Sequence, residues 1–186
     1  MKQILFNTDM VRAILEGRKT VTRRVVKPQP KEAITVDYHD DKNKRWIRGI
    51  FVENGANYPA PYRPGDILYV QETFFEYRGN FYYKADRKHE ALSKLGIRFK
   101  WHPSIHMPRE AARIFLRVTD VRVERVQDID DDGVVAEGLN IGDPFDELWD
   151  STIKPADRAL YGWDANPWVW VIEFERITRE EALPHA

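Results

Sequence analysis

The chain of 186 residues contains no cysteine. This absence excludes disulfide bonds, a thiolate nucleophile and zinc sites built on cysteine. Apolar runs that approach the ~18 residues of a membrane-spanning helix are also missing. The first fifteen residues lack the apolar stretch and the cleavage site of a signal peptide. We therefore expect a cytoplasmic protein with no membrane partner.

The net charge of −1 is small, yet the charge is distributed unevenly along the chain. Residues 1–48 carry a net charge of +6, residues 49–118 carry +4, and residues 119–186 carry −11. A phosphate-bearing partner would therefore meet the N-terminal half, although a total charge near zero argues against an extended non-specific duplex binder. The length favours a single domain over residues 1–186 with an insertion at about residues 31–61, and we expect a monomer.

Residues 17–24, with the sequence GRKTVTRR, form a dense polar cluster. The amphipathic residues 7–16 before it predict a short helix that ends at Gly17 in the left-handed conformation. The β-prone residues 21–26 after it predict a strand that Pro28 terminates. Binding and catalytic groups are often positioned at such rigid junctions. The alternative is that the helix dipole alone favours Lys and Arg after a helix C-terminus.

The rest of the chain shows short strand patterns separated by turns. Strands are predicted at residues 2–6, 67–72, 112–126 and 169–174, a strand pair around Gly79-Asn80 within residues 77–85, and short helices at residues 134–137 and 145–149. A phase slip near Asp120 suggests a bend of the kind that closes small barrels. The insertion predicts at most a weak hairpin around residues 45–52. We therefore predict the α+β class, in the form of a small mixed β-barrel decorated with short helices.

His102 and His106 have the i, i+4 spacing of a helical metal-binding pair. Pro108 prevents a continuing helix there, and the sequence places no third ligand nearby. We interpret residues 101–108 as a loop with ordinary hydrogen-bonded histidines. We therefore expect neither a metal site nor a cofactor.

Four motifs, in order along the chain, resemble the ASCH superfamily. Gly17-Arg18-Lys19 followed by Arg24 matches its G-x-K-x-x-x-x-R signature, and residues 64–68, PGDIL, look like its turn into the next strand. Residues 115–126 and 168–174 fall where the superfamily places its long strand and its final strand. The resemblance covers nearly the whole chain apart from the insertion and parts of residues 87–100, and it implies a PUA-like β-barrel. In detail the chain looks most like the longer ASCH proteins of phages and prophages.

The resemblance also implies a catalytic site. Small bacterial ASCH amidohydrolases deacetylate N4-acetylcytidine with a Lys, a Thr three residues later and a Glu, and these positions fall on Lys19, Thr22 and Glu137. Further contacts with a modified nucleoside or nucleotide are expected from Arg23, Arg24, Glu72, His106, Arg109 and Trp168. Other ASCH proteins are suggested to bind or cleave RNA. Binding of single-stranded RNA or of a nucleotide without hydrolysis, and ribonuclease activity, are therefore the alternatives.

The chemistry of the three implied catalytic residues leaves two assignments open. A Thr hydroxyl is a weak nucleophile until a base removes its proton, and a Lys19 that burial keeps neutral can be that base. The C-terminal end of the preceding helix and a close Glu137 would instead favour the ammonium form. Lys19 would then stabilise the oxyanion, and Glu137 would act as the general base. In both cases we expect none of the three to be a core side chain.

Overall fold

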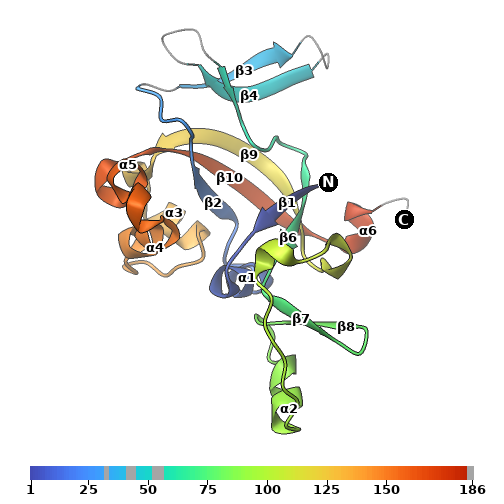
Figure 1. Cartoon of the computed structure of the whole chain (residues 1–186). Coiled ribbons are helices and arrows are strands. Elements are labelled where there is room, and N and C mark those ends of the chain that lie inside the picture. Colours follow the sequence, from blue (N-terminus) through green and yellow to red (C-terminus); the bar gives the residue numbers. More distant parts are fainter. Residues whose placement is uncertain (32–33, 41–44, 52–56, 184–186) are drawn as a thin grey trace. The chain divides into compact units, whose positions relative to one another are not determined.

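The computed structural model describes residues 1–31, 34–40, 45–51 and 57–183. Figure 1 shows the helices and strands of the chain. The chain divides into two compact units. Unit 1 comprises Met1–Lys19, Asp66–Arg117 and Glu175–Ala186, and unit 2 comprises Thr20–Gly65 and Val118–Phe174. Helices and strands occur in both units, which confirms the α+β class. The single domain expected from the sequence stays a prediction.

Unit 1 is built on two parallel strands, β1 (Lys2–Leu5) and β6 (Ile67–Gln71). The second of them also pairs antiparallel with the first residues of β9 (Phe115–Arg125). Leu68 and Val70 are buried because alternate residues of a strand face the same side. The strands predicted at residues 2–6 and 67–72 are therefore confirmed.

Helix α1 (Thr8–Leu15) follows the first strand and ends before Gly17, as predicted. The side chain of Asn7 accepts a hydrogen bond from the Met10 N–H at 2.9 Å, which satisfies one free donor of the first turn. Gly17 has a φ of +77°, a left-handed conformation that glycine adopts without the penalty of a Cβ. The predicted helix stop is confirmed.

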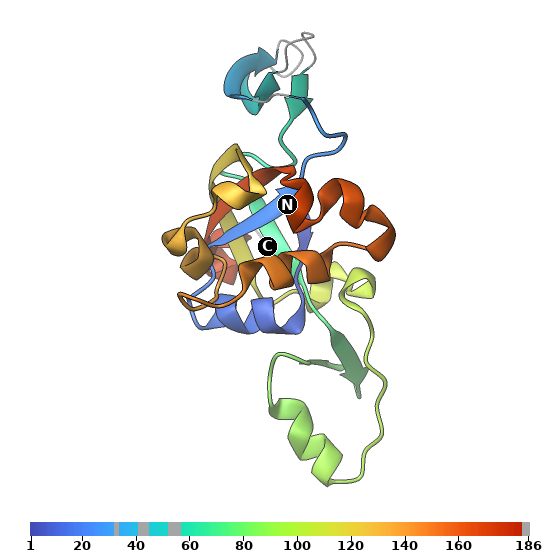
Figure 2. The same cartoon turned by 90° about the vertical axis from the view of Figure 1, so that its left-hand side faces the viewer.

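Strands β7 (Phe74–Tyr77) and β8 (Asn80–Tyr83) form a hairpin in unit 1. The turn consists of Arg78 and Gly79, whose φ angles are +52° and +75°, as a type I′ turn requires. The prediction of a turn at Gly79-Asn80 is wrong by one residue, because Asn80 already pairs with Tyr77. Helix α2 (Lys88–Lys94), which the sequence analysis did not predict, lies beside this hairpin (Figure 2).

Short helical turns complete unit 1. They are η1 (Ser104–His106), η2 (Arg109–Ala111) and α6 (Arg179–Ala182). Side chains from these turns and from the strands pack into one apolar cluster that contains Phe74, Met107, Ala111, Ala112, Phe115, Ile177 and Ala182. No helix in the described ranges is both long and apolar enough to cross a membrane.

In unit 2, strand β2 (Val21–Val25) pairs antiparallel with β10 (Trp168–Ile177). The strands of the main sheet are hydrogen-bonded in the order β1-β6-β9-β10-β2. This sheet is mixed, because the β1–β6 pair is parallel and the β6–β9 and β10–β2 pairs are antiparallel. The described strands form no closed barrel.

Strand β9 changes its buried face where the sequence predicts a phase slip. Leu116, Val118 and Val121 are buried, whereas Thr119 is exposed. The spacing of three residues between Val118 and Val121 breaks the alternation of a regular strand. The change of phase near Asp120 is therefore confirmed.

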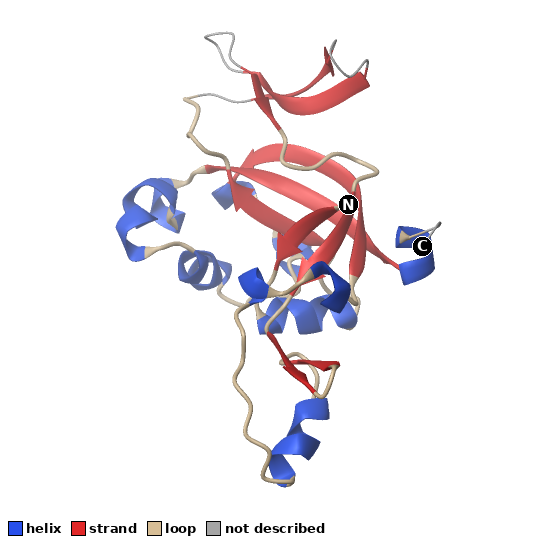
Figure 3. Ribbon diagram, turned by 45° about the vertical axis from the view of Figure 1, so that its right-hand side comes forward, coloured by secondary structure: helices blue, strands red, loops and turns tan. Residues whose placement is uncertain are grey.

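Three strands in the predicted insertion form a separate antiparallel sheet (Figure 3). They are β3 (Ile34–Asp40), β4 (Arg45–Phe51) and β5 (Asn57–Pro59). The prediction of at most a weak hairpin around residues 45–52 is therefore wrong, and its last residue lies outside the described residues. The alternation of Ile34, Val36 and Tyr38 with polar residues is a strand signal that the many polar residues around it obscured.

Helices α3 (Asp131–Ala136) and α4 (Phe145–Thr152) confirm the two short helices predicted here. Asp130 caps the first of them by accepting a hydrogen bond from the Gly133 N–H at 2.8 Å, and Gly138 follows its end with a φ of +94°. The remaining elements of unit 2 are η3 (Val126–Asp128), η4 (Pro155–Asp157), α5 (Arg158–Tyr161) and η5 (Trp163–Ala165).

We predict that Gly17→Ala lowers the free energy of unfolding by about 1 kcal/mol, because a residue with a Cβ pays roughly 1–2 kcal/mol in the left-handed conformation. No atom lies within 4 Å of the added Cβ, so a clash contributes nothing. Gly17→Asn is the matched control and should lose less, since Asn tolerates this conformation better. Urea unfolding followed by tryptophan fluorescence measures the difference. Unchanged stability of Gly17→Ala would contradict the left-handed helix stop.

Candidate functional site

Buried polar side chains identify the candidate site. In the described part of the chain six are buried, namely Lys19, Thr22, Arg23, Gln71, Glu72 and Glu137. Charged side chains are costly to bury unless they are paired, and ionisable groups in unusual environments concentrate at functional sites. Five of the six were candidates from the sequence, and Gln71, which stands in an apolar strand, gave no signal.

The burial of the three implied catalytic residues corrects one expectation. The exposed fractions are 2% for Lys19, 1% for Thr22 and 5% for Glu137. The expectation that none of them is a core side chain is therefore wrong. Truncation of any of them to alanine would disturb packing as well as chemistry, so conservative substitutions are needed to test their roles.

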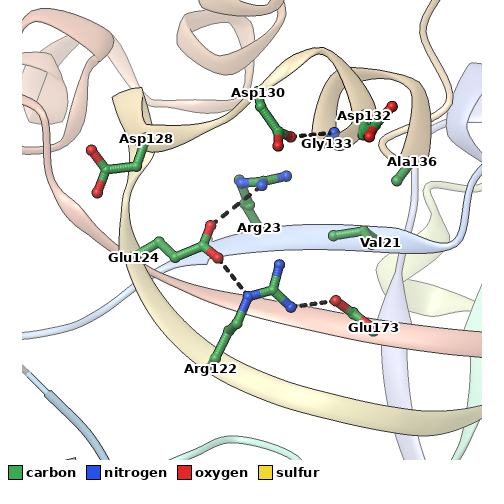
Figure 4. Close-up of a pocket in the computed structure, with 10 residues that line it drawn as sticks. All are labelled: Val21, Arg23, Arg122, Glu124, Asp128, Asp130, Asp132, Gly133, Ala136 and Glu173. Carbon is green, nitrogen blue, oxygen red and sulfur yellow. Dashed lines mark hydrogen bonds and ion pairs between the residues drawn. The ribbon is translucent and has the colours of Figure 1, made fainter.

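Strand β2 presents candidate residues on both of its faces. Val21 and Arg23 line a cavity of about 280 Å³ within unit 2 (Figure 4). Because side chains alternate along a strand, Thr22 and Arg24 belong to the opposite face. The basic segment that the sequence presents as one cluster is thus divided between two faces.

The cavity is lined mainly by charged side chains. The lining residues are Val21, Arg23, Arg122, Glu124, Asp128, Asp130, Asp132, Gly133, Ala136 and Glu173. Arg122 donates to Glu124 at 2.5 Å and also to Glu173 (Figure 4). Burial lowers the pKa of Arg122, but these two carboxylates outweigh it and raise the pKa overall. Five carboxylates and two guanidinium groups make the lining acidic.

Arg23 is held between two carboxylates on this face. Its Nη1 donates to Glu137 Oε1 at 3.3 Å and its Nη2 to Glu124 Oε2 at 3.5 Å, with 3% of the side chain exposed. Arg23 thus pairs with the buried Glu137 and with the partly buried Glu124. Its contact with a substrate stays a prediction.

A backbone hydrogen bond ties the basic segment to the end of α3. The Thr20 N–H donates to the Ala136 carbonyl at 2.8 Å, within unit 2. Thr20 follows Lys19 in the chain, and Ala136 precedes Glu137. On the other face of β2, burial lowers the pKa of Arg24, while the charge of Glu137 acts in the opposite direction. Glu137 therefore acts on two of the three arginines of the basic segment, Arg23 and Arg24.

Lys19 belongs to unit 1, directly after the helix stop. Its N–H donates to the Ala13 carbonyl at 3.1 Å, which completes the end of α1. Its Nζ lies 5.7 Å from the centre of the Phe6 ring, within the range of a cation–π interaction. The helix end thus determines the backbone position of Lys19.

Glu72 is the centre of a second charged cluster, in unit 1. Arg113 binds both of its oxygens, at 2.8 and 2.9 Å, and also binds Asp86 at 2.7 Å. The Arg113 guanidinium lies 4.0 Å from the centre of the Tyr83 ring. Burial raises the pKa of Glu72, and Arg113 opposes this rise. Arg113 already binds both oxygens of Glu72. The expected contact between Glu72 and a substrate stays a prediction.

The remaining candidates lie on other elements. His106 and Arg109 are exposed residues of unit 1, at the end of η1 and the start of η2. Trp168 begins β10 in unit 2, where the Arg125 guanidinium lies 4.1 Å from the ring centre and so stacks on the ring. The described residues contain no group of three or more His, Asp or Glu side chains placed to hold a metal ion.

Comparison of the chain with protein-family models, with curated proteins and with solved structures gave no match. The resemblance to the ASCH superfamily therefore stays a prediction that rests on the four motifs in the sequence.

We predict that Arg113→Met lowers the free energy of unfolding at pH 7 by about 3–5 kcal/mol, because the buried Glu72 carboxylate loses its partner. The raised pKa of Glu72 means that the native state holds this proton more tightly than the unfolded state. Protonation of Glu72 therefore stabilises the native state, and this contribution is lost as pH rises through the native pKa. The variant should regain stability relative to wild type as pH falls from 7 toward the ordinary range of a carboxyl group. Urea unfolding at several pH values measures this.

Arg117→Met is the matched control for this test. Arg117 pairs with Glu175 at 2.7 Å, but both side chains are exposed, so the loss should not exceed about 1 kcal/mol. Adding Glu72→Gln to the Arg113→Met variant should restore most of the lost stability. Equal losses for Arg113→Met and Arg117→Met would show that Glu72 does not need its partner.

Proposed function

We propose that the protein is an amidohydrolase that acts on an N-acylated pyrimidine nucleoside or nucleotide of the N4-acetylcytidine type, and that its open mixed sheet is a variant of the PUA-like fold. The observation that carries this proposal is the burial of Lys19, Thr22 and Glu137, the residues that the resemblance implies as catalytic. Glu137 is paired with Arg23, so its burial alone does not require a function, but buried ionisable groups concentrate at functional sites.

In the proposed reaction the Thr22 hydroxyl oxygen attacks the carbonyl carbon of the acyl group, and a base takes the hydroxyl proton. The carbonyl oxygen becomes an oxyanion. When this intermediate collapses, the C–N bond breaks, the leaving nitrogen takes the proton, and an acyl ester remains on Thr22. Water then attacks the ester in the same way, which releases the carboxylic acid and restores the hydroxyl group.

The two assignments for Lys19 and Glu137 make different demands on the lysine. As the base, Lys19 must be neutral before the attack and accept the proton. As the oxyanion partner, it must stay charged while Glu137 takes the proton. Lys19→Arg separates the two, because an arginine keeps the charge and cannot act as a base. Retention of part of the rate in Lys19→Arg favours the oxyanion role, and its complete loss favours the base.

We predict that Thr22→Val, Lys19→Met and Glu137→Gln each lower kcat/KM by about 10²–10⁴-fold, and that each loses nearly as much as the triple variant. Substitutions of residues that share one catalytic step have non-additive effects on the rate, because each one already abolishes the shared step. The assay follows release of cytidine from N4-acetylcytidine by chromatography, beside other N4-acylated cytosine bases, nucleosides and nucleotides. Independent, additive losses would mean that the three residues only shape the site.

Two control variants test whether any substitution near the basic segment lowers the activity, and thermal unfolding tests whether each variant folds. Thr20→Val and Lys27→Met alter exposed residues near the basic segment and should keep wild-type activity. Thermal unfolding of every variant shows which of them fold. A folded wild-type protein that hydrolyses none of the acylated compounds would contradict the amidohydrolase proposal.

The alternatives are binding of RNA or a nucleotide without hydrolysis, and ribonuclease activity. Binding to single strands predicts an affinity that falls with salt, by roughly 0.7 in the log–log slope for each phosphate contact. The described cavity of unit 2 does not favour this class, since both of its arginines are paired with carboxylates. Salt-dependent oligonucleotide binding without turnover of any acylated compound would support the binding alternative instead.

A further inference from the structure

Unit 1 contains a cavity of about 310 Å³ that is separate from the charged clusters described above. Its lining includes Arg109, Glu110, Ala112, Phe115, Arg179 and Leu183. None of the three proposed catalytic residues lines it. An inference about this cavity is therefore independent of the amidohydrolase proposal.

The floor of the cavity is apolar and belongs to the core. Phe115 and Ala112 are buried members of the apolar cluster of unit 1, and the partly buried Leu183 packs against that cluster. Side chains in such a cluster are held in place by close packing. The floor therefore offers a fixed apolar surface to a ligand.

Two guanidinium groups add positive charge to this lining. Arg109 and Arg179 are exposed, and neither forms an ion pair or a side-chain hydrogen bond within the described part of the chain. Arg113 in the same unit, by contrast, is paired with two carboxylates. With Glu110 as the one acidic residue, the lining carries a net positive charge. The planar guanidinium group matches the geometry of a carboxylate or a phosphate.

Ordered backbone supports both arginines. Arg179 begins helix α6, where the Glu181 N–H donates to the Thr178 hydroxyl at 3.2 Å and Glu181 accepts from the Thr178 N–H at 2.8 Å. The hydrogen bonds with Thr178 hold the pKa of Glu181 below its ordinary value. Arg109 begins η2, and its carbonyl accepts a hydrogen bond from the Ala112 N–H at 3.0 Å.

We propose that this cavity binds a small organic anion, in which a carboxylate or a phosphate monoester is attached to one aromatic or branched aliphatic group. Arg109 and Arg179 bind the anionic group, and the apolar group packs on Phe115 and Leu183. The volume lies at the lower end of the range of about 300–1,000 Å³ for ligand pockets. This size favours a ligand with a single ring over a nucleotide or a peptide.

Titration calorimetry of the full chain at low salt tests the proposal with four probes. Phenyl phosphate and benzoate carry both features, inorganic phosphate carries only the charge, and benzyl alcohol carries only the ring. We expect phenyl phosphate or benzoate to bind at least about tenfold more tightly than either single-feature probe, and the tighter of the two identifies the preferred anionic group. Inorganic phosphate binding as tightly as phenyl phosphate, or no binding of any probe, would overturn the proposal.

Substitutions locate the binding in this cavity. Arg109→Gln and Arg179→Gln should each weaken the better probe by about tenfold, as expected for loss of a charge-assisted hydrogen bond at an exposed site. Glu110→Gln should strengthen binding, because it removes a like charge. Arg87→Gln, at an exposed arginine of the same unit outside the lining, is the matched control and should leave the affinity unchanged. Equal effects of Arg87→Gln and Arg109→Gln would show that the cavity is not the binding site.

Discussion

The pairing of buried charge is the constraint on which both units depend. Each unit contains a buried carboxylate that forms an ion pair with an arginine. Glu72 pairs with Arg113 in unit 1, and Glu137 pairs with Arg23 in unit 2. A buried ion pair is weak evidence for stability, but removal of one partner leaves an uncompensated charge in a medium that solvates it poorly. These pairs therefore restrict which substitutions each unit tolerates at these positions.

The uneven charge of the sequence acquires a different meaning in the structure. Arg23 comes from the basic N-terminal part, and its partners Glu124 and Glu137 come from the acidic C-terminal third. Positive charge from the N-terminal part of the chain and negative charge from the C-terminal third thus partly neutralise one another in unit 2. A net charge counted along a chain predicts a partner surface only when the charges remain exposed. The basic segment alone is therefore poor evidence for nucleic-acid binding here.

The sequence predicts those parts of the fold that local chemistry determines. The helix stop at Gly17 was predictable because it is specified by residues within one or two turns. The burial of Lys19 and Glu137 was not predictable, because the contacts that bury a side chain come from distant parts of the chain. Arg23 and Glu137, for example, are 114 residues apart in sequence. The resemblance to the ASCH superfamily implied the candidate catalytic residues, but only the structure revealed that they are buried.

Neither unit is a continuous piece of chain. The backbone passes from one unit to the other after Lys19, Gly65, Arg117 and Phe174, and the last two positions lie inside strands β9 and β10. No single continuous segment of the chain therefore contains one whole unit alone. Recombination could not exchange either unit as a module without cutting two hydrogen-bonded strands.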